Sequence, residues 1–241
     1  MTAFAYAGRE LDVFARADNW KRYWGSIIRP CVRGEVLEVG AGIGSNTVLL
    51  KDQHHKRWVC LEPDADLSSR LRQHLSAYAS TADCEVITGT LSDLIPGAVF
   101  DVVLYIDVLE HIENDTEELK AAIGRLRPSG VLIVLVPAHQ FLYSNFDRSV
   151  GHFRRYSRQN LCAIAPLQLR LQRALYLDAT GIAASIVNRI LLRQAAPSEM
   201  QITFWDRRMI PLSRILDPIF NFRVGKSLLA IWRHVSSHSL T

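Results

Sequence analysis

The first 136 residues alternate between short runs of β-branched and aliphatic residues and segments of helical composition. The apolar runs are residues 36–39, 58–61, 85–88, 100–106 and 131–136. Runs of this length predict strands, and the segments at 45–50, 65–77 and 114–125 predict helices between them. This alternation predicts βαβ units and a parallel sheet, and the almost uninterrupted apolar run at 131–136 predicts that helices cover both of its faces.

The remaining segments predict further elements of the same fold. Residues up to about Pro30 carry apolar side chains at helical spacing, and 181–193 is a candidate helix. A sixth strand is predicted at 169–177, and a seventh at 227–232 that runs back along the sheet edge. The chain has 241 residues, no internal repeat and no long linker, so we expect a single α/β domain.

The formal net charge of +4 is unevenly distributed along the chain. The segment from Gly181 to the end has eight Lys or Arg against three Asp or Glu, whereas the first 180 residues have 20 against 21. A basic region confined to one part of the chain argues against general nucleic-acid binding and for a local basic surface. We therefore expect no nucleic-acid partner.

Two features indicate a cytoplasmic protein. Charged residues from Arg9 to Arg16 interrupt any apolar segment of a signal peptide, and no apolar run reaches the roughly 18–20 residues that span a bilayer. The four cysteines lie far apart with no CxxC pair, which favours reduced thiols over a zinc site or disulfides.

A glycine-rich loop follows the first predicted strand and precedes a predicted helix. Its sequence is Glu38-Val39-Gly40-Ala41-Gly42-Ile43-Gly44. Glycines allow a sharp turn and a close approach of the backbone to a ligand, and the next helix presents free N–H groups. In a doubly wound sheet, such a loop lies in the crevice at the carboxyl ends of the strands, where ligands bind.

The loop's spacing and its flanking acid distinguish two classes of ligand. Gly-x-Gly-x-Gly differs from the Gly-x-Gly-x-x-Gly of dinucleotide-binding proteins. Glu38 would repel a pyrophosphate, whereas it would attract the ammonium group of S-adenosylmethionine, which contains no phosphate. The loop therefore favours S-adenosylmethionine over NAD.

Residues at three further strand ends are expected to face the same crevice. Glu62 ends the second strand about twenty residues after the loop, where a carboxylate can accept both ribose hydroxyls; capping of the next helix is the alternative. Thr90 follows the third strand, at the expected adenine edge. Asp107 ends the fourth strand, and Val108 and Leu109 are candidates to line the methyl-donor pocket.

Residues 36–47, Glu62 and 106–112 together resemble the class I S-adenosylmethionine-dependent methyltransferases, in register from about Asn19 to Val136. The resemblance implies a seven-stranded, doubly wound sheet whose last strand is antiparallel. It also implies an N-terminal helical lid (1–30), a cofactor-binding core (31–136) and an acceptor-side region with a helical insertion (137–241). The candidate cofactor-binding residues are Tyr23, Glu38, Gly40, Ala41, Gly42, Gly44, Asn46, Glu62, Pro63, Thr90, Leu91, Asp107, Val108 and Leu109.

The chemistry that the resemblance implies is direct displacement at a methyl group activated by a sulfonium. The acceptor atom must lie in line with the C–S bond and about 3 Å from the methyl carbon, and a base is needed only for poorly ionised acceptors. The candidate catalytic residues are His111, His139, Tyr143 and His152. Alternatively, Glu110 and His111 orient their loop and cap the next helix. No pair of metal-ligating acids stands out near Asp107, so we expect no metal.

The acceptor is expected to bind near residues 137–147 and 151–157, which mix aromatic, titratable and donor groups after a strand end. Arg154, Arg155 and Tyr156 are candidate acceptor-binding residues, because adjacent arginines can hold a phosphate or a carboxylate. The alternative is an ordered loop in which salt bridges pair these arginines with acids such as Asp147, with Ser157 capping the next helix.

The same region resembles bacterial class I methyltransferases associated with surface-glycan and lipid pathways, so we expect a small-molecule or lipid- or glycan-linked acceptor. Apolar segments with interspersed arginines within 181–223 suit peripheral contact with an anionic membrane, or simple packing on the sheet. Two other functions stay open. One is an NAD-dependent oxidoreductase or epimerase, and the other is a non-catalytic module that binds the cofactor.

Overall fold

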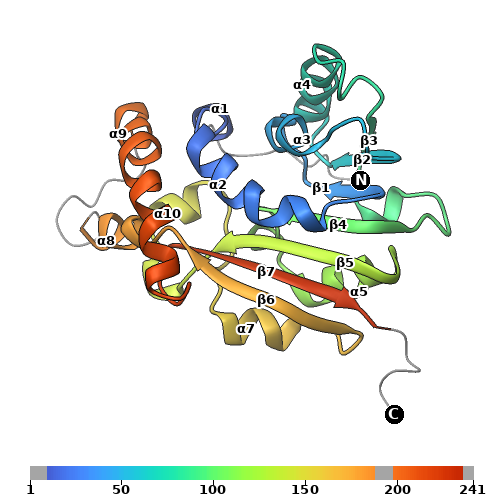
Figure 1. Ribbon diagram of the computed structural model, residues 1–241. Coiled ribbons are helices and arrows are strands. Elements are labelled where there is room, and N and C mark those ends of the chain that lie inside the picture. Colours follow the sequence, from blue (N-terminus) through green and yellow to red (C-terminus); the bar gives the residue numbers. More distant parts are fainter. Residues whose placement is uncertain (1–9, 188–197, 236–241) are drawn as a thin grey trace.

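The computed structural model describes residues 10–187 and 198–235, which form one seven-stranded sheet with helices on both faces (Figure 1). The strands are β1 (Glu35–Val39), β2 (Arg57–Glu62), β3 (Glu85–Thr88), β4 (Phe100–Ile106), β5 (Leu126–Pro137), β6 (Leu169–Leu177) and β7 (Ser227–His234). Their order is β3-β2-β1-β4-β5-β7-β6. β7 is antiparallel to β5 and β6, whereas the pairs among β1 to β5 are parallel. This confirms the expected fold.

The position of the last strand corrects one expectation. β7 lies between β5 and β6, and β6 rather than β7 forms the edge of the sheet. Leu228, Leu229 and Ala230 are all buried, although successive side chains point to opposite faces of the sheet. A strand covered on both faces in this way belongs inside a sheet, where both rows of its backbone groups are paired.

Side chains alternate between two apolar cores, one on each face of the sheet. Val36 and Cys60 belong to the core under α2 (Asp18–Ile28), α3 (Ser45–Leu50) and α4 (Ala65–Ser76). Leu37 and Val59 belong to the core under α5 (Asp115–Ile123) and α7 (Arg158–Ile164). The continuous apolar runs are therefore explained by burial on both sides.

The N-terminal segment forms two helices where the sequence predicts one. α1 (Glu10–Phe14) ends before Ala17, and α2 begins at Asp18 and continues into the 3-10 helix η1 (Arg29–Cys31). α2 packs Trp20, Trp24 and Ile28 against the sheet. The short helices η2 (Leu91–Asp93), η3 (Leu109–His111), η4 (Gln140–Leu142) and α6 (Asn145–Ser149) follow strands β3, β4 and β5.

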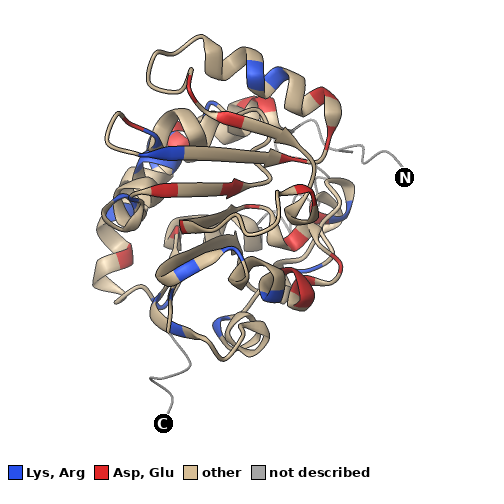
Figure 2. Cartoon of the chain, turned by 90° about the vertical axis from the view of Figure 1, so that its right-hand side faces the viewer, with Lys and Arg blue, Asp and Glu red and all other residues tan. Residues whose placement is uncertain are grey.

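Between β6 and β7 the chain forms α8 (Ala179–Val187), α9 (Glu199–Phe204), the π-helix η6 (Trp205–Met209) and α10 (Ile210–Ile219). These helices stand beside α1 at one end of the sheet (Figure 1). The candidate helix at 181–193 is described only as far as Val187, and its remainder lies outside the described residues. Among the described residues, no helix combines the length and apolarity needed to cross a bilayer. Basic and acidic residues are interspersed over the side of the molecule shown in Figure 2.

Candidate functional site

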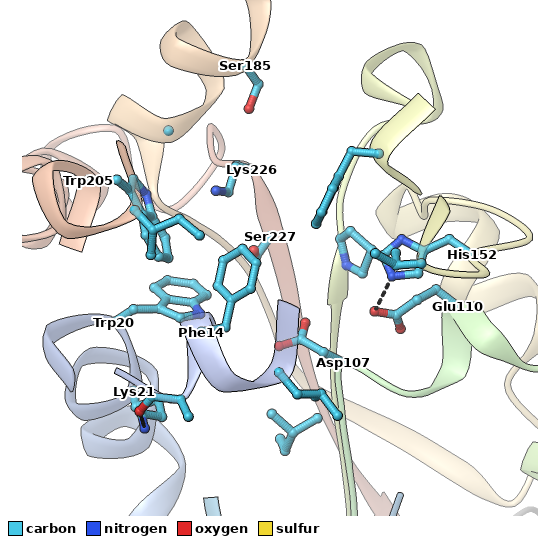
Figure 3. Close-up of a pocket in the computed structure, with 18 of the residues that line it drawn as sticks. Phe14, Trp20, Lys21, Asp107, Glu110, His152, Ser185, Trp205, Lys226 and Ser227 are labelled. Atoms are coloured by element: carbon cyan, nitrogen blue, oxygen red, sulfur yellow. Dashed lines mark hydrogen bonds and ion pairs between the residues drawn. The ribbon is translucent and has the colours of Figure 1, made fainter. Parts of the chain in front are cut away.

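A cavity of about 1120 Å³ lies at the carboxyl ends of β1, β4 and β5. The glycine loop after β1 forms one part of its wall, the segments after β4 and β5 form another, and α1, α2, α8 and α9 close it. Figure 3 shows the aromatic side chains of Phe14, Trp20 and Trp205 facing Asp107 and Glu110 across this space. The cavity therefore has an aromatic side and a polar side.

The backbone of the glycine loop opens onto the cavity. Gly40 and Gly42 have φ values of 65° and 55°, in the left-handed region that favours glycine. A Cβ at Gly40 would lie 2.6 Å from Cγ2 of Val108, which supports the loop from behind. Among the described residues, a Cβ at Gly42 would meet only Leu11, a cavity-lining residue, at 3.8 Å. The loop is thus a cradle that a side chain would fill.

Glu62 lies directly beside this cradle, at the end of β2. Its Oε2 accepts the N–H of Gly42 at 2.8 Å, and its Oε1 accepts the N–H of Asp64 at 3.0 Å. Burial raises the pKa of Glu62, and these two backbone donors oppose the shift. Because each carboxylate oxygen has a second lone pair, the side chain can hold the loop and still accept a ligand hydroxyl. The cradle and this acid fit an adenosyl amino acid.

Glu38 lies beneath the loop and not on the cavity wall. Its Oε2 accepts the hydroxyl of Thr47 at 2.7 Å and the indole N–H of Trp58 at 3.0 Å. Burial raises the pKa of Glu38 to about 7. In this arrangement the carboxylate ties β1 to α3 and β2. Glu38 therefore does not face the cavity, and its expected attraction of a ligand ammonium stays a prediction.

The structure divides the other cofactor-binding candidates into two groups. Those that line the cavity are Gly40, Ala41, Gly42, Asn46 and Asp107. Those outside its wall are Tyr23, Glu38, Gly44, Glu62, Pro63, Thr90, Leu91, Val108 and Leu109. Among the latter, Leu109 is fully buried, and the Tyr23 hydroxyl donates to Oδ2 of Asp217 at 2.7 Å. Thr90 forms a capping box with Asp93 at the start of η2.

The polar side of the cavity brings together two of the candidate histidines and an acid. The rings of His111 and His152 meet edge to face, with centroids 4.5 Å apart. His152 Nε2 lies 3.8 Å from Oε1 of Glu110, and its Nδ1 lies 3.0 Å from Oδ1 of Asp147. Burial lowers the pKa of His111 to about 4 and raises that of Glu110 well above its usual range.

The arginines of the 151–157 segment form ion pairs, as the structural alternative expects. Arg154 Nη1 donates to Oδ2 of Asp115 at 2.5 Å, and the Tyr156 hydroxyl donates to the same oxygen at 2.8 Å. Arg155 Nε donates to Oδ1 of Asp147 at 2.7 Å. Of these three candidates only Arg155 lines the cavity, and its Nη1 has no hydrogen-bond partner within the described residues.

The two remaining catalytic candidates are separated by the fold. Tyr143 lines the cavity and donates its hydroxyl to the carbonyl of His152 at 2.6 Å. His139 is not among the lining residues; its Nε2 lies 3.1 Å from the carbonyl oxygen of Gly225, and its ring stacks on Tyr176. Tyr143 therefore shapes the 144–153 segment, and His139 joins the segments after β5 and before β7.

The sequence reasoning missed Lys226 and the aromatic side of the cavity. Lys226 Nζ lies 4.2 Å from the centroid of the Trp205 ring and 3.7 Å from Oδ2 of Asp178. One signal was available for Lys226: it precedes an antiparallel strand, whose first residues lie at the carboxyl ends of the parallel strands. Trp20 and Trp205 pack with ring centroids 5.9 Å apart, and no local pattern joins these distant positions.

Comparison with known proteins identifies a methyltransferase domain within the chain. Residues 37–132 match the model of a methyltransferase domain family. A search of curated proteins found no match.

The fold is shared with many solved structures. N-methyltransferase NodS from Bradyrhizobium japonicum, in complex with S-adenosyl-l-homocysteine, is 15% identical, with a TM-score of 0.56 over 90% of this chain and 87% of that one. An S-adenosylmethionine-dependent methyltransferase from Clostridium acetobutylicum is 10% identical, with a TM-score of 0.59 over 94% and 96%. The [4+2]-cyclase SpnF is 11% identical, with a TM-score of 0.61 over 90% and 82%.

These identities are low enough that the structural likeness concerns the fold alone. The matched residues 37–132 include the glycine loop, Glu62 and the segment around Asp107. These are the positions that carry the resemblance in the sequence. The strand order and the antiparallel β7 agree with it. Residues 37–132 therefore contain a methyltransferase domain, and the strand order around it is that of the class I fold which the sequence resemblance implies.

Proposed function

We propose that this enzyme transfers the methyl group of S-adenosylmethionine to a small-molecule or lipid- or glycan-linked acceptor by direct in-line displacement. The observation that supports this most is that one continuous cavity of about 1120 Å³ joins the glycine cradle to the aromatic and polar sides. Pockets for one ligand are roughly 300–1,000 Å³, so this volume suits a donor and an acceptor side by side.

Each part of the cavity wall has a task in this proposal. S-adenosylmethionine, when bound, supplies an electrophilic methyl carbon on a positively charged sulfur. The backbone at Gly40 and Gly42 allows close approach of its amino acid end. Glu62 lies just outside the wall, where it holds Gly42, and is the proposed acceptor of the ribose hydroxyls. Phe14 and Trp20 exclude water, which favours a reaction in which charge on sulfur disappears.

The acceptor is proposed to lie between the aromatic side chains and the polar side of the cavity. Its reacting end is proposed to lie on the side of the cavity lined by His111, Tyr143 and His152. Arg155 has an unpartnered Nη1 within the described residues, and Lys226 reaches into the same space (Figure 3). Two cations beside an aromatic surface suit an acceptor that combines an apolar part with a phosphate or carboxylate.

The outer surface of α9 and α10 supports a lipid-linked acceptor. Exposed apolar side chains on these helices and just after them are Met200, Phe204, Leu212, Ile215, Ile219 and Phe220. Exposed arginines among them are Arg207, Arg208, Arg214 and Arg223. Apolar side chains interspersed with arginines suit peripheral binding to an anionic membrane surface. We propose that this face, within residues 198–223, contacts the membrane from which the acceptor is taken.

Vesicle flotation tests the membrane contact. Wild-type protein is expected to float with phosphatidylcholine vesicles that contain phosphatidylglycerol, and Ile215→Glu/Ile219→Glu is expected to remain with the soluble fraction, because two charges would enter the apolar surface. Ile95→Glu/Leu167→Glu is the matched control, since these two residues are 67% and 87% exposed elsewhere on the molecule. Equal flotation of both double variants, or none of the wild type, would contradict the contact.

Methyl transfer is tested with donor labelled in its methyl group and extract fractionated into aqueous, lipid and glycan pools. We expect label in a small-molecule, lipid or glycan product, identified by mass spectrometry. Calorimetry with S-adenosylhomocysteine and NAD is the companion measurement, with binding expected only for the former. Binding without transfer to any pool would support the non-catalytic alternative, and binding of NAD would support the oxidoreductase.

A further inference from the structure

Glu110 is a buried acid at the polar side of the cavity. Its side chain is 1% exposed, and neither carboxylate oxygen has a hydrogen-bond partner within the described residues. Arg155, the nearby guanidinium, donates to Asp147 instead. Buried charges in proteins are paired or coordinate a metal, so a carboxylate in this position calls for a proton or a cation beside it.

Two imidazoles stand next to this carboxylate. One ligand atom from each of Glu110, His111 and His152 lies within 4.8 Å of the other two. Ligand atoms around one ion at about 2.0–2.2 Å are about 3–4 Å apart, so a short inward movement of the side chains would complete such a site. All three residues line the cavity, so the cluster borders its open volume.

The surroundings hold the two rings as metal sites do. His152 Nδ1 forms a hydrogen bond with Oδ1 of Asp147, so that Nε2 faces Glu110. Asp147 is fully buried and is itself held by Arg155 and by the N–H and hydroxyl of Ser144. A carboxylate behind a metal-binding histidine fixes its tautomer and orientation. His111 is oriented by a hydrogen bond with the backbone of Gly151.

We propose that Glu110, His111 and His152 bind a divalent transition-metal ion whose open coordination positions face the cavity. Two imidazoles and one carboxylate suit Zn²⁺, Fe²⁺, Mn²⁺ or Co²⁺ better than Mg²⁺, which takes oxygen ligands and keeps its waters. The ion neutralises the buried carboxylate and presents its open positions to oxygen atoms of the acceptor. The ion would therefore favour an acceptor that has hydroxyl or phosphate oxygens beside the methylated atom.

This site differs from the sequence expectation of no metal. That expectation considered pairs of acids near Asp107. This cluster takes one acid and one histidine from η3, which follows β4, and its second histidine from the loop after α6. Asp107 lines the same cavity but does not belong to the cluster. Binding of the ion does not depend on the methyl donor, so it can be measured without it.

Cobalt titration of the full-length, chelator-treated protein tests the site. We expect one Co²⁺ per chain, visible absorption bands of a protein-bound ion, and a rise in melting temperature. Glu110→Gln and His152→Ala are each expected to weaken binding about tenfold or more, and Asp147→Asn about 10–100-fold, because it removes the partner of His152. His54→Ala, which alters an exposed histidine far from the cavity, is the matched control and is expected to bind as the wild type does.

Circular dichroism shows whether each variant retains the fold. Glu110→Gln is the decisive variant, because it keeps the shape of the side chain and removes a buried charge. Zn²⁺ is expected to displace Co²⁺, and Mg²⁺ is expected not to. The proposal is overturned if the wild type binds neither Co²⁺ nor Zn²⁺ at millimolar concentration, or if folded Glu110→Gln binds them as tightly as the wild type.

Discussion

Gly42→Val is expected to weaken the binding of S-adenosylhomocysteine by about 100-fold or more and to abolish methyl transfer. Gly42 lies at the centre of the cradle with φ 55°, and its N–H donates to Glu62. A β-branched residue in this conformation is strained by roughly 1–2 kcal/mol, and its side chain would stand in the space beside Leu11 where the ligand must lie. Calorimetry measures the loss directly.

Gly97→Val separates the loss of the cradle from general strain. Gly97 has φ 79°, and a Cβ there would meet no atom of residues 10–187 or 198–235 within 4 Å, so its variant carries similar backbone strain at an exposed position. We expect a comparable drop in melting temperature for both variants, with unchanged ligand affinity only for Gly97→Val. Wild-type affinity in folded Gly42→Val would remove the glycine loop from the binding site.

Glu62→Ala is expected to weaken binding of S-adenosylhomocysteine by about 100-fold or more. The substitution removes a carboxylate that holds Gly42 and Asp64 and that we propose accepts two ribose hydroxyls. Hydrogen bonds to a charged group contribute about 1.5–3 kcal/mol each, and 1.4 kcal/mol corresponds to a factor of ten in affinity. Glu62→Gln keeps one acceptor oxygen and is expected to lie between the wild type and Glu62→Ala.

A ligand that lacks the ribose 2′-hydroxyl distinguishes contact with the sugar from support of the loop. The wild type is expected to prefer S-adenosylhomocysteine over this deoxy analogue by about tenfold or more, and Glu62→Ala is expected to lose most of that preference. If Glu62→Ala still prefers S-adenosylhomocysteine over the deoxy analogue, Glu62 only holds Gly42 in place, and another group binds the ribose hydroxyls.

The core strands were predictable because their signals are local. The apolar runs at 36–39 and 100–106 lie within β1 and β4, and the helix predicted at 45–50 coincides with α3. β7 was predicted by its composition but was placed at the edge of the sheet. A strand's position in the order depends on which neighbours bury its two faces, and that is decided by contacts between distant segments.

The candidate site was predictable only where function depends on the backbone and on strand ends. The place of Gly40 and Gly42 on the cavity wall was predictable from the glycine spacing of the loop. That of Asp107 was predictable from its position directly after β4. The orientation of Glu38 was not predictable, because Thr47 and Trp58, which bind its carboxylate, come from other elements. The aromatic side of the cavity and the His152–Asp147 pair were not predictable either. Both depend on how the segments after β5 and β6 pack against the rest of the domain.

A crystal structure of the protein grown with S-adenosylhomocysteine tests the whole account most directly. We predict that the ligand's amino acid end lies against the backbone of residues 40–42 and that the ribose hydroxyls lie within hydrogen-bond distance of the Glu62 carboxylate. A ligand bound elsewhere, or one whose ribose is turned away from Glu62, would contradict it.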